Sequence, residues 1–193
     1  MTEANNPYSP ERLADRAAIQ DVMYRYCRGV DRLDLDTLRS AYHPDAIDNH
    51  GAYNGGIDGF VEWVRGRHQK IPFSKHLVSN ILIEFVGPHE AAVETYCIAT
   101  QRYPSDARES LTALLGDSVE GGDGAVDLIV YARYVDHVTR RDGAWRIQQR
   151  NVVLDSTSFI KAPTGASNTV ERQIYGRHDT QDFLYELRAR LGL

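Results

Sequence analysis

The hydrophobic pattern of this chain changes its period once, and this change restricts the fold more than any other feature. Up to about residue 70, apolar side chains recur every three or four positions, as on one face of a helix. From Lys75 to Asp155 they alternate with polar residues, as in half-buried strands. Short turns such as Gly87-Pro88-His89 join these strands, so they are antiparallel neighbours. The pattern predicts an α+β domain, with N-terminal helices on the concave face of a cone-shaped, curved antiparallel (mixed) sheet and an open mouth suited to a small molecule.

Periodicity and capping residues place the individual elements. Ser9 before Pro10 indicates a helix start, because serine caps helices and proline is favoured in the first turn. The predicted helices are residues 10–31, 34–42, 59–69 and 180–191, and the predicted strands are residues 46–51, 75–86, 91–103, 126–139 and 144–155. Residues 104–124 are a polar insertion. We expect one domain over residues 1–193, with its core in about residues 10–155 and a C-terminal extension at 156–193.

Composition argues against several classes of function. The net charge of −5 disfavours nucleic acid or an anionic membrane as partner. Cys27 and Cys97 lack metal-ligand spacing and are expected as reduced core residues. No apolar run is long enough to span a bilayer, and the first residues show no apolar signal region, so a cytoplasmic protein is expected. Phosphate-binding, nucleophile-elbow and zinc motifs are missing, so neither cofactor nor metal is expected.

Polar side chains interrupt the apolar pattern at four positions that carry chemistry. Asp31 ends the first helix beside its apolar stripe, where the helix dipole and the apolar surroundings both disfavour a carboxylate. Tyr26 carries a hydroxyl into the middle of the same stripe. His76 lies near the start of the first long strand, and Arg150 lies late in the last strand. An acid, an imidazole and a guanidinium from three elements would converge if the helix covers the sheet.

Each candidate also has an ordinary structural explanation. A helix-end acid can cap a loop, a strand histidine can bond at a sheet end, and a strand arginine usually lies on the solvated face. His50 shares a strand face with Asp48, and Asp48 is expected to be a rim residue. Arg133 alternates with its neighbours in the strand before the last. Taken together, these residues are a more specific signal of a functional site than any one of them alone.

Four stretches share a pattern with one known family. They are residues 12–21, Gly29-Val30-Asp31, the set His76, Asn80 and Glu84-Phe85, and residues 141–151. Together they resemble the SnoaL-like branch of the nuclear-transport-factor-2-like superfamily, over roughly residues 10–155. The resemblance implies a cone-shaped α+β fold and a homo-oligomer, commonly a trimer. In family enzymes a histidine paired with an aspartate removes a proton, and a leaving group departs from the neighbouring carbon.

The resemblance assigns roles by position. Asp31 is the helix-end acid, His76 the general base, and Arg150 a guanidinium that keeps Asp31 ionised or holds an oxyanion. Tyr26 matches a tyrosine of the family's dehydratases, whereas its dehydrochlorinases carry a lysine there. This difference favours substrates that carry oxygen rather than chlorine. Tyr26 would then bind a substrate oxygen or protonate the leaving oxygen.

These roles predict a cofactor-independent lyase that acts on a hydrophobic, hydroxylated aromatic or polycyclic molecule, as in aromatic-compound catabolism. Loss of water is the first choice, and loss of formaldehyde is kept open. The expected substrate-binding residues are His50, Asn80, Tyr53, Tyr96 and Arg133. The alternatives are an isomerase or cyclase with the same base, a non-catalytic binding module, and the small subunit of a ring-hydroxylating dioxygenase.

Overall fold

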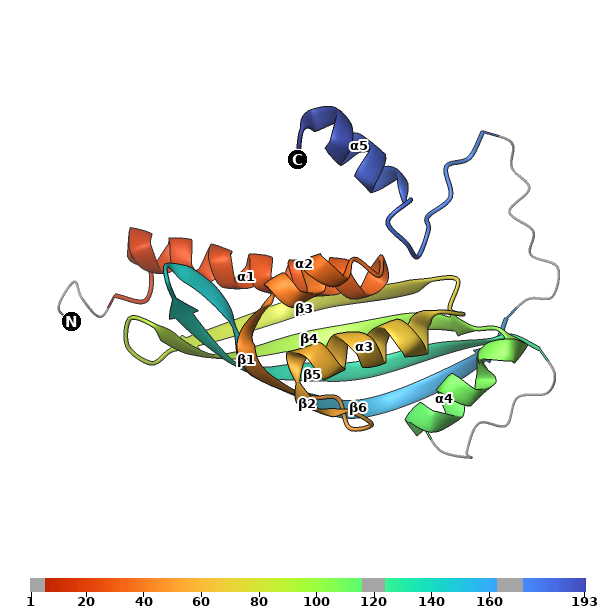
Figure 1. The fold of residues 1–193 in the computed structure, drawn as a ribbon. Helices are drawn as coiled ribbons and strands as arrows, with labels where there is room; N and C mark the ends of the chain where they lie inside the picture. Colours follow the sequence, from red (N-terminus) through yellow and green to blue (C-terminus); the bar gives the residue numbers. More distant parts are fainter. Residues whose placement is uncertain (1–5, 116–123, 163–171) are drawn as a thin grey trace.

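The computed structural model describes residues 6–115, 124–162 and 172–193, and its first three helices lie on one side of a curved sheet (Figure 1). The helices are α1 (Pro10–Asp31), α2 (Leu35–Ser40), α3 (Ile57–His68), α4 (Arg108–Leu115) and α5 (Phe183–Leu191), with a short 3-10 helix at Ser105–Ala107. The strands are β1 (Tyr42–Asn49), β2 (Asn54–Gly56), β3 (Ser74–Phe85), β4 (Glu90–Tyr103), β5 (Val126–Arg141) and β6 (Ala144–Lys161). The predicted α+β class with a helix-covered, cone-shaped sheet is confirmed.

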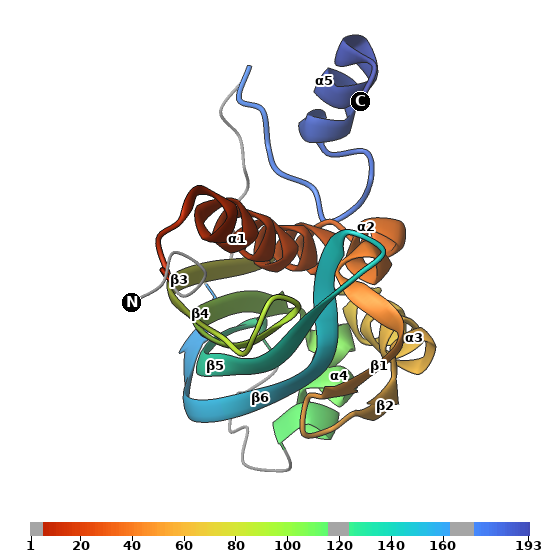
Figure 2. The same ribbon diagram turned by 90° about the vertical axis from the view of Figure 1, so that its left-hand side faces the viewer.

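The six described strands form one mixed sheet in the order β2-β1-β6-β5-β4-β3. From β3 to β6 the strands are an antiparallel meander, as the short turns predict. β1 pairs with β6 in parallel and with β2 antiparallel, which makes the sheet mixed. Figure 2 shows the sheet curving from β3 beside α1 round to β1 and β2 beside α3. The concave face therefore lies between the meander and these two helices.

Helix α1 starts and ends as its sequence predicts. The Ser9 side chain caps it by accepting a hydrogen bond from the Arg12 backbone N–H at 3.3 Å. Its apolar stripe is buried at every turn, at Ile19, Val22, Met23, Tyr26, Cys27 and Val30. The last residue of the helix is Asp31. Burial of the stripe against the sheet brings this carboxylate to the concave face.

Gly29 allows α2 to pack tightly behind this end of α1. A Cβ at residue 29 would lie 2.6 Å from the Leu38 Cα, closer than real side chains approach backbone. The turn between the two helices bends through Leu33, whose φ is +46°. Any larger residue at position 29 would push α2 away and move the end of α1.

The main core fills the space between α1, α3 and the sheet. Phe60 and Val61 of α3 and Ile147 of β6 are fully buried in it. Truncating a residue such as Phe60 to alanine in a core of this kind costs about 3–5 kcal/mol. A smaller cluster lies by α4, at Ile71, Tyr103, Ala107, Leu111, Val126 and Leu128.

The boundaries differ most from the expected ones at β1 and β6, and the elements β2 and α4 were not expected. β1 begins at Tyr42 rather than residue 46, because a register shift in its pairing with β6 accommodates Pro44. β6 continues beyond residue 155 to Lys161, because these residues pair with the start of β5. α4 lies within the expected polar insertion, whose residues 116–123 are outside the described part of the chain. No described helix is long and apolar enough to cross a membrane.

Candidate active site

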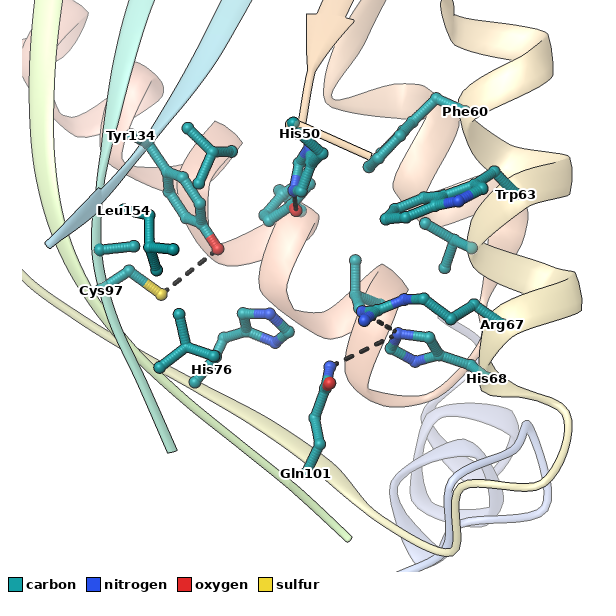
Figure 3. A pocket seen from close by; sticks show the side chains of 18 of the residues that line it. His50, Phe60, Trp63, Arg67, His68, His76, Cys97, Gln101, Tyr134 and Leu154 are labelled. Carbon is teal, nitrogen blue, oxygen red and sulfur yellow. Dashed lines mark hydrogen bonds between the residues drawn. The ribbon is translucent and has the colours of Figure 1, made fainter. Parts of the chain in front are cut away.

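An apolar cavity lies between the concave face of the sheet and the helices α1 and α3. It encloses about 900 Å³ between its side chains, a value that includes the open mouth. Figure 3 shows Phe60 and Trp63 on the α3 side facing Cys97 and Tyr134 on the sheet side. Its lining is Tyr26, Val30, His50, Gly51, Phe60, Trp63, Val64, Arg67, His68, His76, Cys97, Ala99, Gln101, Val130, Ala132, Tyr134, Val152, Leu154 and Thr157. The polar groups of this lining are few and cluster around the imidazoles.

The first of these imidazoles belongs to His76, which the structure joins to Asp31. His76 Nδ1 lies 2.6 Å from Asp31 Oδ1, and its ring borders the cavity. The other Asp31 oxygen accepts the His76 backbone N–H at 2.8 Å, and Ser74 Oγ donates to Oδ1 at 3.1 Å. Burial by itself raises the pKa of Asp31, but the His76 ring and these hydrogen bonds lower it overall, so the carboxylate stays ionised.

The other ring nitrogen of His76 has no hydrogen-bond partner among the described residues. Because Asp31 accepts from Nδ1, the neutral ring carries its proton there and leaves a lone pair on Nε2. This is the arrangement that a general base needs.

A second aspartate–histidine pair lies on β1 and the turn after it. Asp48 makes a short hydrogen bond with His50 Nδ1, and Tyr42 donates to its other oxygen at 2.5 Å. The Asp48 side chain is fully buried. The expectation that Asp48 is a rim residue is therefore wrong. Alternation along β1 turns both side chains inward, and the Asp-x-His spacing was the signal for the pair.

Tyr26 connects the two pairs. Its hydroxyl lies 3.1 Å from His50 Nε2. The centre of its ring is 6.2 Å from that of His76 and 6.4 Å from that of His50. Burial raises the pKa of Tyr26 strongly, so its hydroxyl keeps its proton. The site thus has a base on one side and a protonated phenol, backed by a second imidazole, on the other.

Arg150 does not contact Asp31, and its expected role there is wrong. Its guanidinium bonds in a bidentate manner to Asp136, at 2.8 and 2.6 Å, and both side chains are fully buried. It also lies 4.1 Å from the centre of the Tyr26 ring and 4.0 Å from that of Tyr134. Two rings that line the cavity therefore cover it, and it has no place in the lining itself.

Two of the expected substrate-binding residues, Asn80 and Tyr53, do not line the cavity. Asn80 is exposed in a bulge of β3, where its φ is +47°. Tyr53 donates to the Gly56 carbonyl at 2.6 Å, and its ring packs on Phe60 and Trp63 behind the cavity wall. The structure corrects both predictions.

Tyr96 and Arg133 are also placed wrongly, because they lie on the outer face of the sheet. They are cross-strand partners on β4 and β5. Tyr96 is 45% exposed, and Arg133 donates to Glu94 at 2.8 Å and pairs with Asp155. Among the five expected substrate-binding residues, only His50 lines the cavity.

Sequence reasoning missed a hydrogen-bonded chain at one end of the cavity. Gln101 donates to Ser74 Oγ at 3.3 Å and lies 3.4 Å from His68 Nε2. His68 Nδ1 lies 3.2 Å from His178 Nε2, and His178 Nδ1 lies 2.9 Å from the Asp31 carbonyl. Burial lowers the pKa of both His68 and His178, so both rings are neutral. The chain ties the C-terminal segment to the end of α1.

Comparisons with known proteins show which proteins this chain is similar to. Gamma-hexachlorocyclohexane dehydrochlorinase of Sphingobium indicum is 30% identical over 73% of this chain and 81% of its own. The solved structure of a type 2 hexachlorocyclohexane dehydrochlorinase has a TM-score of 0.66, with 20% identity over 83% of this chain and 98% of its own. That of a protein described as a putative scytalone dehydratase, from Novosphingobium aromaticivorans, has a TM-score of 0.62, with 24% identity over 84% of this chain and 97% of its own.

The dehydrochlorinase is a lyase, and the two solved structures establish the likeness of the fold. The family model described as a SnoaL-like domain matches residues 11–151, which hold α1, the two histidines and most of the sheet. This chain therefore belongs to the SnoaL-like domain family.

Proposed function

We propose that this protein is a cofactor-independent lyase whose general base is His76. The 2.6 Å contact between Asp31 and His76 Nδ1, with Nε2 open to an apolar cavity, carries the proposal. Nε2 takes a proton from a substrate carbon next to an activating group. The imidazolium that forms is stabilised by Asp31, as in other aspartate–histidine pairs. General acid–base assistance of this kind is worth about 10²- to 10⁴-fold in rate.

Tyr26 is the proposed acid. The electrons of the broken C–H bond form the new C=C bond, and the C–O bond to the neighbouring carbon breaks. The hydroxyl of Tyr26 gives its proton to the departing oxygen, so that water leaves. Because Asp48 bonds to Nδ1 of His50, Nε2 of the neutral ring accepts from the tyrosine hydroxyl at 3.1 Å and holds it in place. The tyrosine oxygen regains a proton from solvent. His76 then returns the carbon-derived proton to solvent.

The cavity supports an aromatic or polycyclic, hydroxylated substrate. Phe60 and Trp63 offer ring faces on one wall, and the cross-strand partners Cys97 and Ala132 lie on the opposite wall. In a substrate with a hydroxymethyl arm, the same base would remove the O–H proton, and C–C cleavage would release formaldehyde. The C–C electron pair would stay on the remaining carbon, which then takes up a proton. We place this second among the lyase reactions.

An isomerase or cyclase would use the same base and return the proton elsewhere on the substrate. A binding module or a dioxygenase small subunit has no use for a buried carboxylate–imidazole contact, so the Asp31–His76 geometry favours an enzyme. Product mass separates the remaining alternatives.

The outer sheet face supports a homo-oligomer, which we propose is a trimer. It exposes apolar side chains at Leu77, Tyr96, Ile98, Tyr131 and Val135. Light scattering during size-exclusion chromatography should give three times the mass of the chain. A monomer would contradict this proposal without affecting the proposed reaction.

The proposed reaction is tested by incubating the protein with a panel of hydroxylated aromatic and polycyclic compounds and measuring product masses. We expect a product lighter by one water or one formaldehyde, and no such product with His76→Ala. A product of unchanged mass would contradict the lyase proposal in favour of an isomerase. Turnover that persists in the variant would contradict the assignment of the base.

A further inference from the structure

One cation in the cavity lacks a counter-ion. Arg67, next to the last residue of α3, extends into the cavity toward His68 (Figure 3). Arginine is charged at any ordinary pH. Among the described residues that line the cavity, it is the one arginine or lysine, and none is Asp or Glu. The aspartates of the two histidine pairs lie behind their imidazoles.

The hydrogen bonds of Arg67 go to neutral groups. Nη1 donates to the Tyr103 hydroxyl at 3.0 Å, and Nη2 donates to His68 Nε2 at 2.8 Å. The guanidinium also lies 4.9 Å from the centre of the Trp63 ring. Within the described parts of the chain, no carboxylate comes within 4.0 Å of it. Two of its five N–H groups are used, and the buried Nε has no partner.

Arg150 shows what a compensated guanidinium looks like in the same fold. It is fully buried, and Asp136 faces it with both carboxylate oxygens. Burying a cation costs free energy unless an anion or strong acceptors face it. Arg67 is only partly buried, but it projects into an apolar cavity where a ligand would exclude water. A ligand with an anionic group would supply the charge that the chain omits.

The neighbours of Arg67 hold it in position. His68 accepts from Arg67 at Nε2, so its proton lies on Nδ1 and points to His178. Burial and the nearby guanidinium keep the pKa of His68 well below its usual value, so this ring adds no charge. The chain continues through Gln101 to Ser74, which donates to Asp31. One hydrogen-bonded chain thus joins Arg67 to the carboxylate of the proposed base.

We propose that Arg67 binds a carboxylate of the substrate, so that the substrate class is an aryl or polycyclic hydroxy acid. A planar guanidinium with free N–H groups on Nη1 and Nη2 fits two carboxylate oxygens. The apolar walls strengthen this contact, because the effective dielectric constant is low there. The reaction part of this inference rests on the proposed function, whereas the binding part does not. Bound at Arg67, the acid would present its ring system between α3 and the sheet, toward His76.

The test compares two ligands of the same shape, 2-naphthoate and 2-naphthamide, by titration calorimetry. We expect the wild-type protein to bind the carboxylate about 10- to 100-fold more tightly than the amide, because a hydrogen-bonded ion pair is lost with the amide. Arg67→Gln should remove this preference and leave the affinity for the amide nearly unchanged. Arg133→Gln, on the outer face, is the matched control and should behave as wild type.

Equal affinities of the wild-type protein for the two ligands would overturn the proposal, even if Arg67→Gln fails to fold. A preference that persists in folded Arg67→Gln would overturn it as well. His76→Ala separates this inference from the proposed reaction, because it should keep the preference for the carboxylate while turnover is lost. If the wild-type protein prefers the carboxylate but turns over no compound, the anion site stands and the lyase proposal is contradicted.

Discussion

The two aspartate–histidine pairs of the cavity have the same internal bond and opposite surroundings. In both, an aspartate oxygen binds Nδ1 of the imidazole. Nε2 of His76 has no partner among the described residues, whereas Nε2 of His50 contacts the Tyr26 hydroxyl. In each pair the aspartate fixes which ring nitrogen is available, and the group beyond that nitrogen fixes whether the ring takes a proton from a substrate or orients a neighbouring hydroxyl.

A third imidazole–carboxylate contact provides the reference. His137 lies 3.1 Å from Glu90 on the outer face, and both side chains are about half exposed. His137 has a carboxylate partner but does not line the cavity, so removing its imidazole should leave the reaction unchanged.

Breaking the first pair should have the largest effect. His76→Ala removes the proposed base and should lower kcat by about 10³- to 10⁴-fold. Asp31→Asn should lower it by about 10²-fold or more, because the ring is no longer held in the tautomer with an open Nε2. Steady-state kinetics with any substrate found by product mass measures both. His137→Gln is the control, and an equal loss there would contradict the comparison.

Removing the buried cation behind Tyr26 should act on stability rather than chemistry. Arg150→Ala leaves Asp136 buried without its partner and should lower the free energy of unfolding by about 3–5 kcal/mol. Urea denaturation measures this effect. A variant of unchanged stability with lost activity would restore the catalytic role that the sequence predicted for Arg150. The double variant Arg150→Met, Asp136→Leu should recover much of the stability.

Breaking the second pair should have a smaller effect that depends on the leaving group. Tyr26→Phe should lower kcat by about 10- to 100-fold for a hydroxyl leaving group, the lower end of general acid catalysis. The loss should shrink for an ester of the same substrate, because a carboxylate leaves without protonation. An equal loss with both leaving groups would contradict the role of Tyr26 as the acid. His50→Gln should follow the same trend.

The smallest expected effect concerns His68 and His178, which are hydrogen-bonded to the end of α1 that carries Asp31. Burial keeps the pKa values of His68 and His178 below the usual 6.5. Below that pH the unfolded chain binds protons at both side chains and the folded protein does not, so stability falls as the pH drops. Urea denaturation at about pH 7.5 and 5.5 should show this fall, and His68→Gln should reduce it. If the stability of His68→Gln depends on pH as that of the wild type does, the account of His68 as a buried, neutral imidazole is contradicted.

The fold was predictable because periodicity records which faces are buried. The helix that ends at Asp31 and the strand that carries His76 near its start follow from spacing, and the family resemblance placed the two together. The cross-strand register was not predictable. A register shift between His137 and Val138 brings Asp136 opposite Arg150, and alternation along one strand does not reveal such a shift.

The outer-face errors have a similar cause. Tyr96 and Arg133 are polar or aromatic residues of the kind that line pockets, but alternation from Cys97 places Tyr96 on the other face. Asn80 lies in a bulge, where alternation is interrupted. His178 was missed because its partners are distant in sequence. Arg67 was missed because only packing shows which cations lack a counter-ion.

The most direct test of the proposed base is the position of the proton on its ring. In uniformly ¹⁵N-labelled protein, NMR coupling patterns distinguish the two tautomers of the neutral His76 imidazole. We predict the proton on Nδ1, facing Asp31, and an unprotonated Nε2. A neutral ring with its proton on Nε2 would contradict the role of His76 as the base and the pairing on which the proposed reaction depends.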